Sequence, residues 1–395
     1  VEALSVHLHA QLPVIVPTAI AAPVETARIE AVASAPVATT TAAAMRMPKA
    51  TVVDGRRALR GRDAGGIRFE PKFSQAYRAL YFAVDDLQGD FAAEERITVR
   101  CTLAPERNIP LREHVVFGQH LLPTDAWIEL VLAAFRTCFS AGEVSLQQIA
   151  LVAPLIGLPG RATAVEIEFR RHGGGLLCTV RSGTAEDARV HLQARIETRS
   201  AAVRGPLVDA ASFETREQRE AAQIATNAGT WYAPLQQIRF GDDRAEGLIR
   251  VAEHALQFVA EPFALYGALC TAINHANWRA AREHGASDDQ FLPVRIERFA
   301  MLAAITGRDF TARVALREAD HDRMRFDIAL VNDGGREVAI MEGVRLQRVA
   351  RATLQLELGR AEERLLPECR KLLAGWDELQ QSLTGEHFVF RVRDR

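Results

Sequence analysis

The stretch of residues 114–135 reads HVVFGQHLLPTDAWIELVLAAF and holds the pattern HxxxGxxxxP, followed at once by an apolar helical repeat. Its histidine, His114, is a natural general base near neutral pH, because its unperturbed pKa lies in the working range. Gly118 allows a close backbone approach, while Pro123 ends the strand and favours a helix capped by Thr124 or Asp125. The alternative interpretation is a structural histidine in a turn before a core helix.

Length and composition limit the class of protein. The chain has 395 residues, a formal net charge of -2 and 48% hydrophobic residues, enough for two or three domains with a sizeable core. Near-neutral charge gives no electrostatic case for nucleic-acid binding. Five scattered cysteines without a CxxC pair argue against a zinc or disulfide scaffold and favour the cytoplasm. No apolar run reaches the roughly 18–20 residues of a membrane span, and the N-terminus does not resemble a signal peptide.

Composition shifts divide the chain into five parts. Residues 1–50 are rich in Pro, Ala, Val and Thr and are predicted to be an interdomain linker, while residues 51–94 are a linker or an ambiguous segment that includes a short helix. Residues 95–205 are predicted to be one helix-and-strand unit and residues 206–350 a second. Residues 351–395 are charged, carry leucines and are predicted to be a linker helix.

The second unit repeats the plan of the first, a long helix followed by antiparallel strands. Residues 199–229 are polar and charged, which indicates a connector between the two units. Pro262 opens the second long helix, and Gly285 closes it. Asn332-Asp333-Gly334-Gly335 is a strong hairpin-turn signal between the last two strands.

Several motifs in this order resemble the dehydratase-domain family of modular polyketide synthases. HVVFGQHLLP matches the catalytic-histidine motif, and WIELVLAA matches the following helix with its glutamate, Glu129. VHLQARIET resembles the strand whose histidine, His191, closes the first unit, and YAPLQQI resembles the YGPxF segment through Tyr232 and Pro234. EPFALYGALC and LPVRIERF fall where the family has HPxxLDxxxQ and LPFxW. The resemblance covers about residues 95–350 and implies an α+β fold, the double hot dog.

The sequence departs from the family at the acid. The resemblance implies that a histidine removes the α-proton of a β-hydroxyacyl thioester and that an aspartic acid on the second helix protonates the departing hydroxyl. Tyr266 stands where that aspartic acid is expected. A phenol of pKa about 10 stays protonated and donates a hydrogen bond, or the ring merely fills the space. Further departures are Thr124 for Gly, Ala233 for Gly, Glu261 for His, Cys270 for Gln or His, and Ile296 for an aromatic residue.

Two other carboxyl groups stand near the motifs. Asp125 and Glu261 are candidates for a displaced acid, although a helix cap and a partner of the helix dipole are the favoured interpretations. The other histidines are expected to be structural (His120, His191) or exposed to solvent (His172, His254, His275, His321).

The resemblance implies a site with His114 as base and Tyr266 beside it. The substrate tunnel would be lined by Val116, Phe117, Gly118, Pro123, Tyr232, Pro234, Leu265 and Leu269. No metal or diffusible cofactor would be needed, since the substrate would arrive on the phosphopantetheine arm of an acyl carrier protein. Neighbouring synthase domains, including an upstream ketosynthase, and a second copy in a homodimer are the partners implied.

Three functions follow from a retained base and a missing acid. The first is histidine-only chemistry on a carrier-bound thioester: double-bond migration, ring closure by oxygen attack on an enoyl thioester, or assistance to chain branching. The second is a non-catalytic scaffold that docks a carrier protein or holds a dimer. The third is an ordinary β-hydroxyacyl dehydratase with Tyr266 as acid. Fold alone does not choose among them.

Overall fold

The structure, a computed structural model, describes residues 77–350 with short gaps at 79–80, 90, 117–118, 140–143, 184–187, 198–205, 210–211, 225–231, 255, 286 and 288. The predicted linkers at residues 1–50 and 351–395 lie outside the described residues, as do Phe117 and Gly118 of the expected tunnel. The boundary expected at residues 205 and 206 meets one of the gaps, so it stays a prediction.

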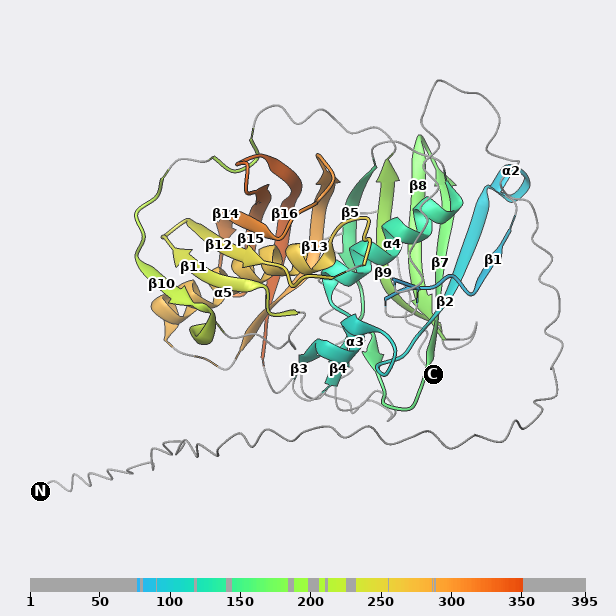
Figure 1. Cartoon of the computed structure of the whole chain (residues 1–395), viewed down its shortest axis with the longest axis horizontal. Helices are drawn as coiled ribbons and strands as arrows, with labels where there is room; N and C mark the ends of the chain where they lie inside the picture. The colour runs from blue at the N-terminus through green and yellow to red at the C-terminus, as the bar shows by residue number, and fades with distance from the viewer. Residues whose placement is uncertain are drawn as a thin grey trace, which may run out of the picture. The chain divides into compact units, whose positions relative to one another are not determined.

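The first half is a six-stranded antiparallel half-sheet with the helix α4 (Thr124–Cys138) on one face (Figure 1). Its spatial order is β1-β2-β7-β8-β9-β5. The strands alternate buried and exposed side chains because one face meets the helix and the other meets solvent. Their bounds are β1 Asp86–Gln88, β2 Arg96–Leu103, β5 Ser145–Leu151, β7 Thr163–His172, β8 Gly175–Ser182 and β9 Arg189–Glu197.

The second half repeats this plan around the longer helix α5 (Pro262–His284). Pro262 opens the helix and Gly285 is its C-cap with a φ of 85°, as the sequence predicts. The half-sheet has the order β13-β16-β15-β14-β12-β11-β10. Its strands are β10 Glu217–Glu220, β11 Leu235–Phe240, β12 Arg244–Arg250, β13 Gln290–Met301, β14 Asp309–Ala319, β15 Arg323–Asn332 and β16 Glu337–Val349.

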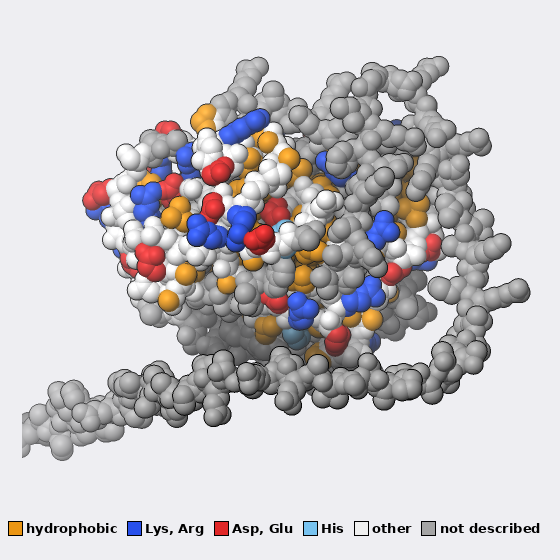
Figure 2. Space-filling view, in the orientation of Figure 1, with side chains coloured by type: hydrophobic (Ala, Val, Ile, Leu, Met, Phe, Trp, Pro, Cys, Tyr) orange, Lys and Arg blue, Asp and Glu red, His pale blue; other side chains and the backbone are white. Residues whose placement is uncertain are grey.

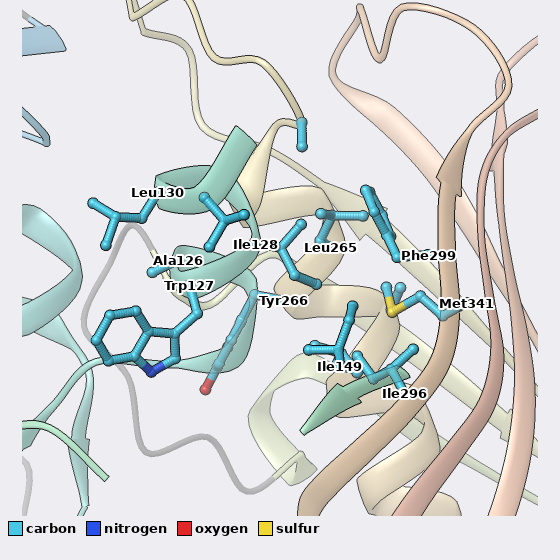
Figure 3. Close-up of a cluster of buried hydrophobic side chains, with 14 of the residues drawn as sticks. Ala126, Trp127, Ile128, Leu130, Ile149, Leu265, Tyr266, Ile296, Phe299 and Met341 are labelled. Atoms are coloured by element: carbon cyan, nitrogen blue, oxygen red, sulfur yellow. The ribbon is translucent and has the colours of Figure 1, made fainter. Parts of the chain in front are cut away.

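Strands β5 and β13 join the two halves into one sheet. Their antiparallel register places Ile296 opposite Ile149 and Phe299 opposite Leu146. All four side chains are fully buried. The helices α4 and α5 also touch each other above this seam, where Figure 3 shows buried side chains of both helices beside those of β5 and β13. Apolar burial at about 25 cal/mol per Å² makes such a seam a main source of stability.

Small elements before α4 hold the histidine motif in place. The helix α3 (Ile109–Glu113) leads into β3 (Val115–Val116), which pairs with β4 (Gln119–Leu121), and β4 pairs with β6 (Ile156–Gly157). A further short helix, α2 (Phe91–Glu94), precedes β2.

None of the helices in the described ranges is both long and apolar enough to cross a membrane. Basic and acidic side chains are interspersed on the described part of the face in Figure 2.

One local prediction is wrong, and one segment holds a strand that its composition does not indicate. The N-cap of α4 is Pro123, in extended conformation and without a side-chain cap, so neither Thr124 nor Asp125 caps the helix. The polar connector contains the edge strand β10, followed by the 3-10 turn η1 (Ala221–Gln223). Its sequence, EQRE, carries no apolar alternation because the strand lies at the sheet edge, where a strand does not need a buried face. The hairpin turn at Asn332–Gly335 is confirmed, with the Gly335 N–H donating to the Asn332 carbonyl over 2.9 Å.

Candidate active site

His114 lies at the junction of α3 and β3, where both its backbone and its ring are fixed. Its N–H donates to the Pro110 carbonyl over 3.2 Å, and its carbonyl accepts the Leu121 N–H over 3.0 Å. Ring Nδ1 lies 3.0 Å from the Leu121 carbonyl oxygen. A carbonyl only accepts, so Nδ1 carries the proton and Nε2 keeps its lone pair. No described residue is hydrogen-bonded to Nε2.

The surroundings keep this imidazole uncharged. Burial lowers the pKa of His114 to about 4, and the bond to the Leu121 carbonyl offsets the shift only in part. Two tyrosine rings supply much of the wall: Tyr266 meets His114 edge to face at 5.6 Å between ring centroids, and Tyr232 lies 6.2 Å away. A neutral, orientated imidazole at neutral pH has the protonation state that a general base requires.

A cavity of about 450 Å³ opens at His114. Of the described residues expected along the tunnel, Val116, Pro123 and Leu269 line it, and so does Tyr266. Tyr232, Pro234 and Leu265 are buried but are not part of the lining. Tyr232 and Leu265 instead fill the core beside the cavity. Figure 3 shows the Leu265 side chain beside Phe299 of the seam.

Tyr266 is placed next to the base by α5. It lies one helical turn before Cys270, whose thiol is near enough to influence the pKa of the phenol. In Figure 3 its hydroxyl lies at the end of the cluster that also holds Trp127, away from the seam residues Ile296 and Phe299. Burial, together with the neighbouring Cys270, raises the pKa of the Tyr266 phenol, so this group stays protonated.

Asp125 lies in the first turn of α4 and lines the same cavity. It is 0% exposed, and neither of its carboxyl oxygens has a hydrogen-bond partner among the described residues. Burial raises the pKa of Asp125 well above its ordinary value; the Tyr232 hydroxyl lies near enough to oppose this shift, but outside hydrogen-bonding geometry. The charged form of Asp125 would raise the pKa of both Tyr266 and Cys270, which shows that these groups share one electrostatic environment.

Two other buried carboxyl groups have structural partners. Glu129, one turn after Asp125, accepts the N–H groups of Val259 and Ala260 at 2.9 and 2.7 Å and the Tyr77 hydroxyl at 2.9 Å. Glu261, just before α5, lies 3.4 Å from Nε2 of His254 and is not part of the cavity lining. Glu261 is therefore a poor candidate for the displaced acid. The pair also raises the pKa of His254.

The remaining histidines are structural or exposed. His191 stacks on Trp127 at 5.6 Å, donates from Nδ1 to the Ala153 carbonyl over 3.0 Å, and accepts the Ser182 hydroxyl at Nε2 over 2.7 Å. His120 binds the Leu111 carbonyl. The prediction that His275 faces solvent is wrong: it is 0% exposed because α5 presses it against the sheet, and it binds the Gly241 carbonyl.

The prediction that His254 faces solvent is also wrong, since its side chain is only 9% exposed beside Glu261. His172 and His321 are exposed, as expected. Among the described residues no group of three or more His, Cys, Asp and Glu side chains is arranged to hold a metal ion. The expectation that no cofactor is bound stays a prediction.

Comparison with protein-family models identifies the class of protein. Residues 88–183 match the model described as "Polyketide synthase dehydratase domain", and residues 215–356 match the one described as "Polyketide synthase dehydratase N-terminal domain". Together they cover both halves of the sheet. The chain belongs to the polyketide synthase dehydratase family.

Known relatives agree with this assignment. The chain is 26% identical over 271 residues to a phenolphthiocerol/phthiocerol polyketide synthase subunit of Mycobacterium tuberculosis strain CDC 1551 and, equally, to one of strain H37Rv. Each match covers 63% of this chain and 14% of the relative. The chain thus corresponds to about one seventh of the length of those relatives.

Solved structures confirm the fold. The dehydratase domain from the CurJ module of the curacin polyketide synthase superposes with a TM-score of 0.58 at 16% identity, covering 69% of this chain and 97% of that domain. A dehydratase domain from Brevibacillus brevis gives 0.55 at 20% identity, covering 64% and 94%, and an N-terminal dehydratase from the difficidin assembly line gives 0.58 at 13%, covering 69% and 100%. The two helix-on-sheet halves are therefore a double hot dog, as expected.

Proposed function

We propose that this domain uses His114 as a general base on an acyl thioester, in a reaction that moves protons without expelling water. The observation that carries the proposal is the orientation of the imidazole. Its Nδ1–H is committed to the Leu121 carbonyl, and its free Nε2 belongs to a residue that lines the cavity. The chemical class is proton transfer at a carbon next to the thioester carbonyl, as in double-bond migration.

The side chain that α5 places beside His114 supports a reaction without a leaving hydroxyl. The α5 position expected to hold an aspartic acid carries Tyr266, whose raised pKa makes it a weaker acid than a free phenol. A neutral phenol still donates a hydrogen bond and can polarise the thioester oxygen. The N-terminus of α4, which begins next to the cavity at Thr124, adds a favourable dipole for an enolate. Ring closure on an enoyl thioester and assistance to chain branching need the same groups.

A purely structural role explains these features less well. A scaffold needs neither a cavity of about 450 Å³ nor an orientated histidine without a described partner for Nε2.

We propose that the acyl chain arrives on the phosphopantetheine arm of an acyl carrier protein. The family assignment and the multidomain relatives support this, and they support neighbouring synthase domains as partners. A homodimer is the usual state of the family and is proposed here on that ground.

The test is a mass-spectrometric assay in deuterated water. The native chain and the variant His114→Ala are each incubated with a carrier protein loaded in turn with a β-hydroxyacyl and a 2-enoyl chain. We expect the native chain to incorporate deuterium into the enoyl chain and shift its double bond. His114→Ala should lower both rates by about 100-fold or more, since general bases contribute roughly 10²–10⁴.

The two substrates separate the competing functions. Loss of water from the β-hydroxyacyl chain would assign ordinary dehydration and contradict the proposal. A complete lack of change in either chain, with a folded protein, would favour the scaffold. Because His114 is only part-buried, its truncation should leave the fold intact, and thermal unfolding of His114→Ala provides the check.

A further inference from the structure

The two buried carboxyl groups of α4 differ in a way that packing does not explain. Asp125 and Glu129 lie one helical turn apart and are both 0% exposed. Glu129 is surrounded by donors from Val259, Ala260 and Tyr77. Asp125 has no such partner for either oxygen among the described residues. Burying a polar group without a hydrogen bond costs free energy, so an unpartnered carboxyl group in a cavity wall points to a functional use.

The surroundings of Asp125 show which use is available. It lines the cavity together with His114, Tyr266 and Cys270. It lies four residues after Leu121, whose carbonyl orientates the base, at the start of a helix whose residues 125–135 are buried. Hydrogen bonds from Leu121 N–H to the His114 carbonyl and from Trp127 N–H to the Pro123 carbonyl hold the backbone that carries both groups. Such rigidity is what a pair of proton-transfer groups requires.

From these contacts we infer that Asp125 is the second catalytic residue of the site, an uncharged carboxylic acid that donates a proton to the acyl chain. Asp125 on α4 thus provides the carboxylic proton donor that α5, which carries Tyr266 at the expected position, lacks. This inference rests on the proposed function of His114 and names the group that works with it.

Electrostatics support the assignment and favour Asp125 over Tyr266 as donor. Burial raises the pKa of Asp125, so the group holds its proton near neutral pH. An ordinary carboxylic acid begins about six pKa units more acidic than a phenol, so a protonated carboxyl group is the better donor of the two. The Tyr232 hydroxyl, which is also buried without a hydrogen-bond partner among the described residues, lies beside Asp125 rather than in the cavity lining.

The proton transfer balances without any further reactant. His114 Nε2 accepts a proton from the carbon at one end of a three-carbon allylic unit, and the C–H electron pair moves into a dienolate. The Asp125 O–H gives its proton to the carbon at the other end, where the returning electron pair forms the new C–H bond. The product is an isomer with no atom gained or lost. The imidazolium then returns its proton to the Asp125 carboxylate, which restores both groups.

The experiment separates proton removal from proton delivery. A 2-enoyl pantetheine thioester is incubated in deuterated water with the native chain, Asp125→Asn and the control Glu261→Gln. The control removes the charge of a buried carboxyl group that lies outside the cavity lining. We expect Asp125→Asn to slow double-bond migration by about 100-fold or more, while deuterium exchange driven by His114 stays within a few-fold of native. Glu261→Gln should migrate the double bond at the native rate.

Each other outcome decides a separate point. Double-bond migration at the native rate in Asp125→Asn overturns the inference. An equal loss of deuterium exchange and double-bond migration also overturns it, because it would mean that Asp125 only positions His114. Water loss from a β-hydroxyacyl thioester that disappears in Asp125→Asn supports the inference and contradicts the water-neutral function. Absence of His114-dependent exchange in the native chain contradicts the proposed function before any variant of Asp125 is examined. Thermal unfolding of each variant identifies a misfolded one, and Asp125→Glu then serves as a second test, with partial recovery of migration expected.

Discussion

The two hot dogs share one architecture but differ in the chemistry at the start of their helices. The first two turns of α4 carry two carboxyl groups, Asp125 and Glu129, both inside the protein. The first three turns of α5 carry a phenol and a thiol, Tyr266 and Cys270, one helical turn apart. The first turns of α4 thus hold two buried carboxyl groups, whereas the first turns of α5 hold none. The comparison teaches that the polar content of a hot-dog helix can change while its packing is retained.

The largest expected effect concerns the carboxyl group that ties α4 to the segment before α5. Glu129→Ala would leave the Val259 and Ala260 N–H groups and the Tyr77 hydroxyl without their acceptor. An unsatisfied buried donor costs about 1–3 kcal/mol, so we expect the free energy of unfolding to fall by about 3 kcal/mol or more. Chemical denaturation measures it. A fall below about 1 kcal/mol would show that water replaces the carboxylate without loss.

Glu129 should also make stability depend on pH. Burial raises its pKa from 4.5 to about 7 against three opposing hydrogen bonds, so the folded chain keeps a proton that the unfolded chain releases. The resulting stabilisation is complete below pH 4.5 and is lost as pH rises through 7. At about 1.36 kcal/mol per pKa unit it amounts to roughly 3 kcal/mol.

Glu129→Gln isolates this contribution from the other titrating groups. Its free energy of unfolding, measured by denaturation at pH 5 and pH 8, should fall less with rising pH than that of the native chain. The imidazoles of His114, His191 and His275, whose pKa values are lowered to about 4, act in the opposite direction and are common to both proteins. Identical pH dependence in the two proteins would contradict the prediction.

A smaller effect is expected where α5 lies closest to its sheet. A Cβ at Gly247 on β12 would collide with the Thr271 hydroxyl of α5 and lie 3.0 Å from a Leu235 methyl. Overpacking of this kind costs about 1–3 kcal/mol, so Gly247→Ala should lower the melting temperature by several degrees. The control is Gly174→Ala, in a turn of the first half with nothing within 4 Å of its Cβ. Equal melting temperatures for both variants would refute the close packing of α5 on β12.

The smallest effect sharpens the comparison at the active site. Tyr266→Phe removes the hydroxyl but keeps the ring that packs edge-on against His114. A single neutral hydrogen bond is worth about 0.5–1.5 kcal/mol, so we expect a fall in the migration rate of about 2- to 10-fold. Kinetics on the same enoyl thioester measure it. A loss as large as that of His114→Ala would move the acid role from Asp125 to Tyr266.

Strong local signals predicted the elements well. Pro262 and Gly285 mark the ends of α5, and the alternation along most of β14 reflects one buried face, so hydrophobic periodicity and helix-ending residues predict these elements. Two short elements were missed, because β10 and the two-residue strand β6 are formed by pairing with neighbours rather than by their own side chains.

The candidate site was only partly predictable from the sequence. His114, Tyr266, Val116, Pro123 and Leu269 do meet at one cavity. The burial of Asp125 was not foreseen, since Asp in the first turn of a helix ordinarily indicates a cap, and its burial depends on residues distant in sequence, such as Tyr232. Tyr232 and Leu265 were assigned to the tunnel because sequence cannot tell which side of a wholly buried helix or strand end faces a cavity.

The pairing of β5 with β13 has a consequence for synthesis of the chain. One side of β5 pairs with β9, but its other side stays an open edge until β13 has been made, roughly 140 residues later. At about 5–20 residues per second the ribosome needs roughly 7–28 s for that interval. Open strand edges invite pairing with other chains. The nascent first hot dog therefore depends on its own C-terminal half as an intramolecular chaperone, and a ribosome pause between the two halves would lengthen its exposure to aggregation.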